Sequence, residues 1–178
     1  MARTHDPEIR DQLLGKAFDY VCEHGVSELS LRDLAGELGI SPGSLLYHFG
    51  SKEGLMMELV RVGRKRQQQM VKENDDLTAL WRAVTTPRWL PITRLFFEVY
   101  ALALQAPDRF PGFAQSAVKD WIDAIEPSKD PIRRADATVV IALFRGLLLD
   151  YCATGDRKRS NLALERFAAI FVENSTAK

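Results

Sequence analysis

Apolar residues recur at intervals of three and four positions along most of the chain, and no segment alternates convincingly with a period of two. The first clear stripe consists of Leu13, Leu14, Ala17, Phe18 and Val21 and ends at Gly25. This spacing places the apolar side chains on one face of a helix. Because the same spacing continues to the end of the chain, we expect an all-α protein with about nine helices.

Residues that favour helix ends divide the N-terminal part into short helices. Ser30 and Asp33 resemble a capping box, which predicts a second helix over about 30–38. Ser41 is expected to cap a third helix that carries Pro42 at its first position, where no amide hydrogen is missed. A fourth helix is then expected to run to about residue 72.

Prolines divide the remainder of the chain. They form three pairs, each displaced by 20 residues from the last, at Pro87/Pro91, Pro107/Pro111 and Pro127/Pro131. A fixed period can indicate a repeat, but the sequences between the pairs share little else. Three helices of similar length, each with proline near its first turn, account for the same spacing. We expect these helices over about 91–106, 111–125 and 131–153, with two more over about 76–86 and 159–174.

The helix expected over 131–153 has two apolar faces, whereas a surface helix needs only one. One face carries small residues, namely Ala135, Thr138, Val139, Ala142 and Gly146. Val140, Phe144, Leu147 and Tyr151 form the other, bulkier face. Together with Phe167 and Phe171 of the last helix, the small face would build a four-helix interface between two chains. A central helix inside a monomer is the alternative explanation.

Composition narrows the class of protein. The 178 residues are 46% hydrophobic and 27% charged, with 24 basic and 24 acidic residues, as expected for one globular unit or two small ones sharing a core. Early charges exclude a signal peptide, and the most apolar run, 139–149, is too short to span a bilayer. Cys22 and Cys152 have no metal or redox spacing. We therefore expect a reduced cytoplasmic protein with buried thiols and no membrane partner.

Motifs for enzymatic chemistry are absent from the sequence. The three histidines, His5, His24 and His48, have no metal-ligand spacing. The chain contains neither a Gly-x-Ser-x-Gly nucleophile elbow nor a phosphate-binding Gly-x-x-x-x-Gly-Lys loop. We expect no catalytic activity, no metal and no cofactor.

Residues 27–55 have the form of a helix-turn-helix, because two short helices are joined by a tight turn containing glycine. The helix over 41–49 would lie in the major groove, with small residues at its start that let backbone amides approach DNA. Tyr47 and His48 could reach a phosphate, and Lys52 could hold one with the free amides of the fourth helix. The candidate DNA contacts are Arg32, Ser41, Pro42, Gly43, Ser44, Tyr47, His48 and Lys52.

The segment Gly39–Leu55, GISPGSLLYHFGSKEGL, is similar to the DNA-binding domain of the tetracycline-repressor (TetR) family of bacterial transcription regulators. With the first helix included, the resemblance covers about residues 5–60. It implies a homodimeric regulator, expected to be a repressor, that binds a pseudo-palindromic double-stranded DNA operator. We expect residues 1–52 to form the DNA-binding domain and 53–178 the effector-binding and dimerisation domain, with the helix over 53–72 as connector.

The resemblance also implies a site for a small, largely apolar effector in the C-terminal part, which holds 12 of the 16 aromatic residues. A helical bundle with many large side chains can enclose an apolar cavity that has a few polar groups. The candidates by position are Phe96, Tyr100, Phe113, Trp121 and Phe144. Ordinary core packing explains the same residues equally well.

Two features depart from the family pattern. Leu46 stands where the family most often has Tyr, and no Arg, Lys, Asn or Gln lies between Ser41 and Phe49, so specificity would depend on Ser44, apolar contact from Pro42, and DNA shape. Residues 1–52 contain five basic and eight acidic residues, a net charge of −3, while the basic cluster at 61–66 is expected to be a solvated helix face. An alternative is therefore a small-molecule-binding helical dimer with weak or lost DNA binding.

Overall fold

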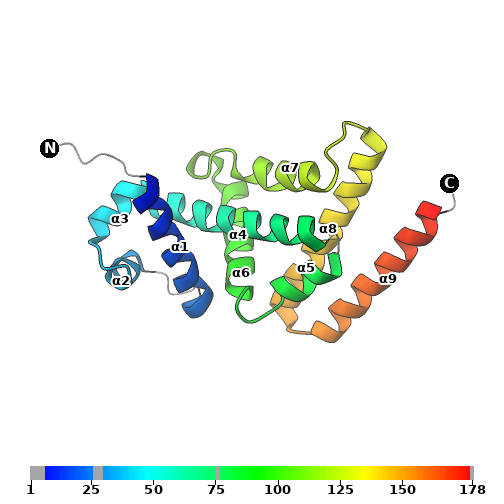
Figure 1. Cartoon of the computed structure of the whole chain (residues 1–178), viewed down its shortest axis with the longest axis horizontal. Coiled ribbons are helices and arrows are strands. Elements are labelled where there is room, and N and C mark those ends of the chain that lie inside the picture. Colours follow the sequence, from blue (N-terminus) through cyan, green and yellow to red (C-terminus); the bar gives the residue numbers. More distant parts are fainter. Residues whose placement is uncertain (1–6, 26–29, 75–76, 177–178) are drawn as a thin grey trace. The chain divides into compact units, whose positions relative to one another are not determined.

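The computed structural model describes residues 7–25, 30–74 and 77–176 (Figure 1). These residues form nine α-helices and contain no strand, which confirms the prediction of an all-α protein. The helices are α1 (Pro7–His24), α2 (Leu31–Glu37), α3 (Pro42–Phe49), α4 (Lys52–Asn74), α5 (Leu77–Val84), α6 (Leu90–Gln105), α7 (Phe113–Ile125), α8 (Pro131–Thr154) and α9 (Arg157–Thr176). A 3₁₀ turn, η1 (Pro107–Arg109), lies between α6 and α7.

The chain divides into two compact units, residues 1–116 and 117–178. Helices α1 to α6, η1 and the first residues of α7 belong to the first unit, and the rest of α7 with α8 and α9 belongs to the second. This division reflects how compactly the residues of each unit pack, and it does not test which residues act together in function. The functional boundary expected between residues 52 and 53 therefore stays a prediction.

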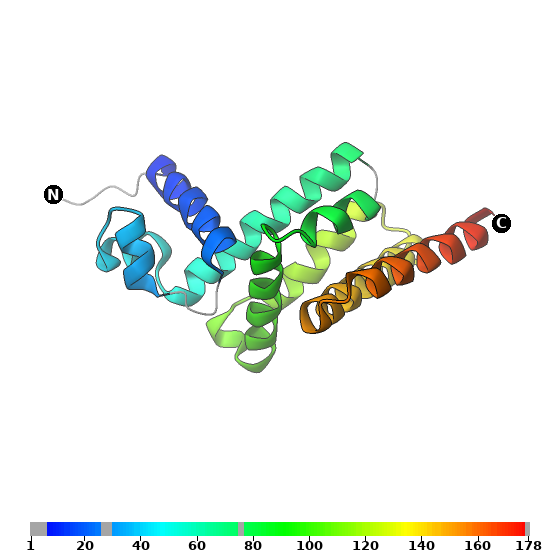
Figure 2. The same ribbon diagram turned by 90° about the horizontal axis from the view of Figure 1, so that it is seen from below.

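Helix α4 is the centre of the first unit, and α1, α5 and α6 pack against it (Figure 2). The core there contains Phe18, Leu59 and Trp81, each at most 1% exposed. Burial of one such side chain stabilises the fold by about 1.5–3 kcal/mol. At Gly63, an added Cβ would lie 2.7 Å from Cγ2 of Ile92, so the absence of a side chain permits the close approach of α4 and α6.

Helices α8 and α9 form an antiparallel pair in the second unit, side by side in both views (Figures 1 and 2). The chain reverses at Gly155, which ends α8 with φ of 69°, a backbone conformation that favours glycine. The Asp150 carboxylate on α8 and the Arg159 guanidinium on α9 form an ion pair at 2.7 Å. Leu148 and Leu164 are buried in the same pair.

Two local predictions were wrong. Helix α7 begins at Phe113 rather than at Pro111, because Gly112 has φ of 68° and cannot continue a right-handed helix.

Cys22 is buried, and this burial raises the pKa of its thiol to about 11. Cys152 is only partly buried, whereas burial of both thiols was expected.

Helix α8 is longer and more apolar than its central run suggested. By length and composition alone it could cross a membrane, although only 22% of its most apolar 18-residue window is buried. The estimate from 139–149 was too short because Ala137 and Thr138 precede that run and uncharged residues follow Asp150 up to Thr154. The helix therefore presents a large uncharged surface.

Candidate nucleic-acid interface

Side-chain caps define the two helices of the helix-turn-helix. The hydroxyl of Ser30 accepts hydrogen bonds from the amides of Arg32, at 3.2 Å, and Asp33, at 3.4 Å, at the start of α2. The hydroxyl of Ser41 accepts one from the amide of Ser44, at 3.1 Å, at the start of α3. Both predicted caps are confirmed.

The turn between these helices is a helix C-cap built around one glycine. Gly39 has φ of 69°, and the next amide, of Ile40, donates to the carbonyl of Ala35 at 2.9 Å. This hydrogen bond, from the sixth residue back to the first, is the one that defines a Schellman motif. It redirects the chain within two residues, so that α3 packs against α2.

One side of α3 holds the helix to the fold. Leu45 is 1% exposed and Phe49 is 7% exposed, four residues apart on the same face. Leu34 of α2 is fully buried within the same helix-turn-helix. The predicted anchoring of α3 through Leu45 and Phe49 is confirmed.

Much of the remaining surface of α3 faces solvent. Pro42, Gly43, Leu46 and Tyr47 are exposed, with exposed fractions of 38% for Leu46 and 45% for Tyr47. Ser44 and His48, both expected to contact DNA, are half-buried at the edge of this face. Sequence reasoning omitted Leu46 because it departs from the usual tyrosine.

The start of α4 carries an exposed cation and packs closely against the end of α3. Lys52 is the first residue of α4 and is exposed, as is Arg32 on α2. The hydroxyl of Ser51 accepts the amide of Gly54 at 3.0 Å. An added Cβ on Gly54 would lie 2.2 Å from the carbonyl oxygen of Phe49, so this glycine lets the end of α3 approach α4 closely.

The next residue, Glu53, links α4 to η1. Its carboxylate accepts a hydrogen bond from the Arg109 guanidinium. The pKa of Glu53 is lowered, first by a hydrogen bond from its own backbone amide and then by the hydrogen bond from Arg109. The first turn of α4 is thus held by Ser51 before it and by Arg109 of η1, both within the first unit.

Arg10 of α1 contacts both α3 and α4. Its Nε donates to the carbonyl of His48 at 3.4 Å, and its guanidinium lies 5.3 Å from the ring centroid of Phe49. Its Nη2 lies 3.6 Å from a carboxylate oxygen of Glu58 on α4. Sequence reasoning missed this role because the Arg10–His48 contact joins residues 38 positions apart. The available signal was a cation one turn before the buried Leu13 and Leu14.

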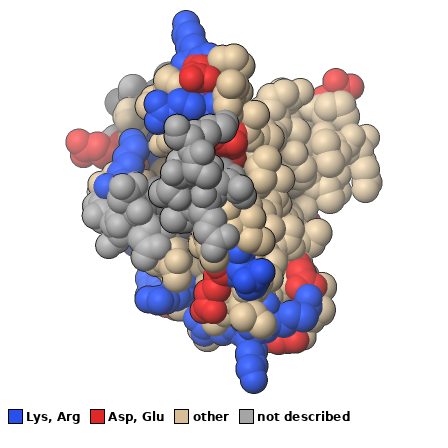
Figure 3. Space-filling view, turned by 90° about the vertical axis from the view of Figure 1, so that its right-hand side faces the viewer, with Lys and Arg blue, Asp and Glu red and all other residues tan. Residues whose placement is uncertain are grey.

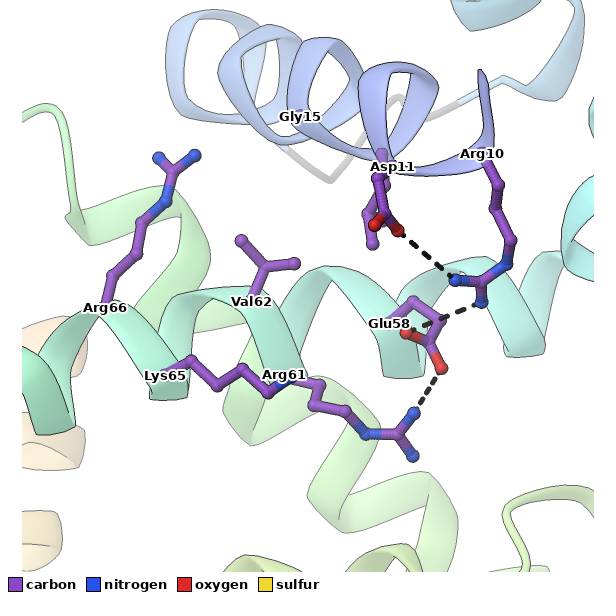
Figure 4. A pocket seen from close by; sticks show the side chains of 9 residues that line it. Arg10, Asp11, Gly15, Glu58, Arg61, Val62, Lys65 and Arg66 are labelled. Carbon is purple, nitrogen blue, oxygen red and sulfur yellow. Dashed lines mark hydrogen bonds and ion pairs between the residues drawn. The ribbon is translucent and has the colours of Figure 1, made fainter. Parts of the chain in front are cut away.

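A cleft of about 280 Å³ lies between α1 and α4 (Figure 4). In Figure 4, the guanidinium groups of Arg10 and Arg61 both extend toward Glu58. The lining residues are Arg10, Asp11, Leu14, Gly15, Glu58, Arg61, Val62, Lys65 and Arg66. The cluster at 61–66 is therefore not simply a solvated face: Arg64 is 8% exposed, and Arg66 lies 4.2 Å from the ring centroid of Phe18.

The five candidate effector contacts are divided between the units. Phe96, Tyr100 and Phe113 lie in the first unit, and Trp121 and Phe144 lie in the second. The Phe96 and Tyr100 rings are 5.6 Å apart and half-buried, whereas Phe113 is 5% exposed and packs in the core. An effector site formed by these residues stays a prediction.

The small-residue face of α8 is exposed along its length. It comprises Ala135, Thr138, Val139, Ala142 and Gly146, all solvent-accessible, and Leu149 extends it with 53% of its side chain exposed. On α9, Leu162 is 60% exposed, Ile170 is 47% exposed, and Phe167 is half-buried. The side chain of Phe171 lies outside those that the structure describes. Figure 3 views the side of the molecule where α9 lies in Figure 1, and charged side chains gather toward its top and bottom.

Comparison with known proteins places the helix-turn-helix in a defined group. Residues 13–59 match the sequence profile described as "Bacterial regulatory proteins, tetR family". The HTH-type transcriptional repressor AcnR of Corynebacterium glutamicum is 35% identical over 65 residues, which are 36% of this chain and 35% of that protein. The HTH-type transcriptional repressor KstR2 of Mycolicibacterium smegmatis is 40% identical over 52 residues, 29% of this chain and 25% of that protein.

The fold extends this similarity beyond the matched segment. The crystal structure of the multidrug binding protein EbrR complexed with imidazole has a TM-score of 0.64 to this chain, with 25% sequence identity and 93% of both chains covered. The sequence alignments with the two repressors span only about a quarter to a third of those proteins. The match to the family profile covers residues 13–59, and the fold match includes the helices that follow them.

Proposed function

We propose, since the chain belongs to the TetR family of bacterial regulatory proteins, that it is a DNA-binding transcriptional repressor controlled by a small molecule. The observation that carries this proposal is the exposed face of α3 in a capped helix-turn-helix, with Lys52 exposed at the start of α4. A short helix anchored on one side and open on the other is the geometry that fits a major groove.

In the proposed complex, α3 enters the major groove with its N-terminal end closest to the bases. Small residues at that end, Pro42 and Gly43, leave room for the backbone to approach. Lys52 and the first amides of α4 would hold a phosphate, since helix N-termini favour anions. Tyr47 would contact the sugar-phosphate backbone through its hydroxyl, and Arg32 would add a second cation from α2.

A second copy of the chain would cover α8 and α9. The small-residue face of α8 is exposed in the single chain, which favours an interface over a central helix in a monomer. Leu149 and Leu162 extend the uncharged surface on the two helices. Soluble proteins seldom leave such a surface uncovered. A two-fold dimer would present two α3 helices and therefore require a pseudo-palindromic operator.

The proposed effector is a small, largely apolar molecule bound within the C-terminal part. EbrR, the multidrug binding protein with the related fold, was crystallised with imidazole. Phe96 and Tyr100 supply a half-buried aromatic pair in this chain, and Trp121 and Phe144 are half-buried in the second unit. Binding would favour a conformation of the dimer in which the two α3 helices no longer match successive major grooves. We place the protein in the cytoplasm, where its operator is.

Selection from random double-stranded DNA tests the proposal. The full-length protein should enrich an inverted repeat with half-sites about one or two helical turns apart. The double variant Tyr47→Ala with Lys52→Ala should fold normally and lose most of its affinity for that repeat. Unchanged binding by the folded double variant would show that the assigned surface is wrong. Gln115→Glu, at an exposed position on α7, serves as the control and should bind normally.

The net charge of −3 over residues 1–52 favours a second candidate, a ligand-binding helical dimer that has lost DNA binding. The same selection separates the two candidates, because this alternative enriches no repeat. Thermal shift with a compound library should find stabilising ligands for either candidate. It identifies the effector class and does not decide between them.

A further inference from the structure

The exposed face of α3 is uncharged and mostly apolar. It carries Pro42, Gly43, Leu46 and Tyr47, and none of these side chains can form a bidentate hydrogen bond with a base. The only side-chain polar atom on these four residues is the Tyr47 hydroxyl. This face therefore lacks the groups with which most recognition helices read guanine or adenine.

Leu46 has no structural reason to be apolar. Leu45 and Phe49 already fill the buried side of α3, while Leu46 lies beside that side, about 60° to 100° around the helix axis, and is 38% exposed. Pro42 lies four residues before Leu46 and is exposed on the same face. The two side chains form a small apolar surface that is continuous with Ser41 and Tyr47 in the proposed DNA interface.

The major groove offers one apolar group along its base edges, the C5-methyl of thymine. We infer that Leu46, together with Pro42, recognises thymine methyl groups and thereby determines the base preference of the operator. This inference rests on the proposed DNA-binding function and specifies the half-site that α3 reads. The absence of charge on this face fits a methyl group and offers no group that would select guanine.

The size of the effect follows from the area that one methyl buries. Removing one buried methyl from the interface should weaken binding about fourfold. A symmetric operator presents the same thymine to each protomer, so removal of both methyls should weaken binding about fifteenfold. This is a modest preference, and A·T-rich half-sites with tolerance at other positions are the expected consequence.

Replacement of thymine by deoxyuridine provides the test, because it removes the methyl and keeps every hydrogen-bonding group. The selected operator is synthesised with symmetric pairs of deoxyuridine, one position at a time, and its dissociation constant is measured with the full-length protein. One or two positions per half-site should show the loss of about fifteenfold. If no position loses more than about twofold, the inference is wrong.

The variant Leu46→Ala assigns the effect to its residue. It should bind the thymine and deoxyuridine operators with equal affinity. The control Leu104→Ala, at an exposed leucine of α6, should still bind the deoxyuridine operator about fifteenfold more weakly than the thymine operator. Leu46→Met, which retains an apolar side chain of similar reach, should also keep most of this preference for the thymine operator. A deoxyuridine loss that persists in folded Leu46→Ala would overturn the assignment.

The two proposals fail in different ways. If the selection enriches no inverted repeat, the proposed function fails before any methyl is removed. If a repeat is enriched and bound tightly but is insensitive to deoxyuridine, DNA binding stands and the thymine inference fails. The deoxyuridine series on the unaltered protein needs no variant to fold, so it remains decisive by itself.

Discussion

Helices α3 and α8 each have one buried face and one exposed, uncharged face, but we propose that the exposed faces bind different partners. Each buries one side in its own unit and presents an uncharged side to solvent, through Leu46 and Tyr47 on α3 and through Val139 and Ala142 on α8. They differ in length, with 8 residues in α3 and 24 in α8.

Length decides what an uncharged helix face can bind. The exposed face of α3 spans about two turns and begins at a helix N-terminus, where amides favour phosphate oxygens. Such a face is too small to hold two proteins together, but it fits the width of a major groove. The face of α8 continues for most of the helix, and its small residues permit close approach of a second helix. The same pattern therefore predicts a polar groove in one place and a self-complementary interface in the other.

A charge on the α8 face should have the largest effect. Ala142→Glu buries an unpaired carboxylate from each protomer, and each costs several kcal/mol. The dissociation constant of the dimer should rise more than about 100-fold, with a parallel loss of operator binding because one α3 alone reads half the site. Sedimentation measures the first and fluorescence anisotropy the second. Gln115→Glu adds the same charge elsewhere and should leave the dimer intact; a dimeric Ala142→Glu would assign the α8 face to another role.

Loss of the Arg10 contacts should weaken operator binding about tenfold. The guanidinium joins α3 to α1 and α4, so Arg10→Gln leaves the end of α3 less well positioned in the groove. Because the Arg10 side chain is about one-third exposed, its contribution to overall stability should be small. The measurement is the ratio of operator affinity to affinity for random DNA, together with the thermal midpoint.

Two comparisons distinguish positioning by Arg10 from direct phosphate contact. The salt dependence of binding should not change in Arg10→Gln, whereas a lost phosphate contact would reduce it. Adding Glu58→Gln to Arg10→Gln should cause little further loss, since the two side chains form one network. Arg88→Gln is the matched control, because Arg88 also pairs with α1, at Asp19, and lies between α5 and α6, outside the helix-turn-helix.

The sequence was sufficient to predict what depends on neighbours within one helix. The caps at Ser30 and Ser41, the anchoring by Leu45 and Phe49, and the exposed small face of α8 all follow from local spacing. These features are fixed by interactions over at most four residues or by helical periodicity.

Features that depend on tertiary contacts could not be predicted in the same way. Arg10 reads as an ordinary surface cation until α1 and α3 are placed together, and Arg64 becomes buried only when neighbouring helices pack around α4. The start of α7 was misplaced because proline favours a helix start, but the left-handed Gly112 follows it. Core and ligand contacts use the same aromatic residues, so Phe113 could be assigned to the core only from its burial.

Loss of one proposed phosphate contact should have a smaller effect than loss of positioning. Lys52→Ala should weaken operator binding about fivefold and random DNA binding by a similar factor, because a phosphate contact carries no sequence information. With Arg32 and Lys52 from each protomer, the logarithm of affinity should fall with the logarithm of salt with a slope of about 4. Lys52→Ala should reduce that slope to about 2. A slope near 10 for the unaltered dimer would show that many more cations reach the DNA.

The smallest expected effect separates the two exposed side chains of α3. Tyr47→Phe removes the hydroxyl and keeps the ring, so only a hydrogen bond to the DNA backbone is lost, and binding should weaken about threefold. The deoxyuridine loss should remain fully present in Tyr47→Phe, because the methyl contact belongs to Leu46. Leu46→Ala should show the reverse, with no deoxyuridine loss and an unchanged salt slope. If Tyr47→Phe abolished the deoxyuridine loss instead, the phenol would be the group that orients the methyl contact, and α3 would read thymine through Tyr47 and not through its apolar surface.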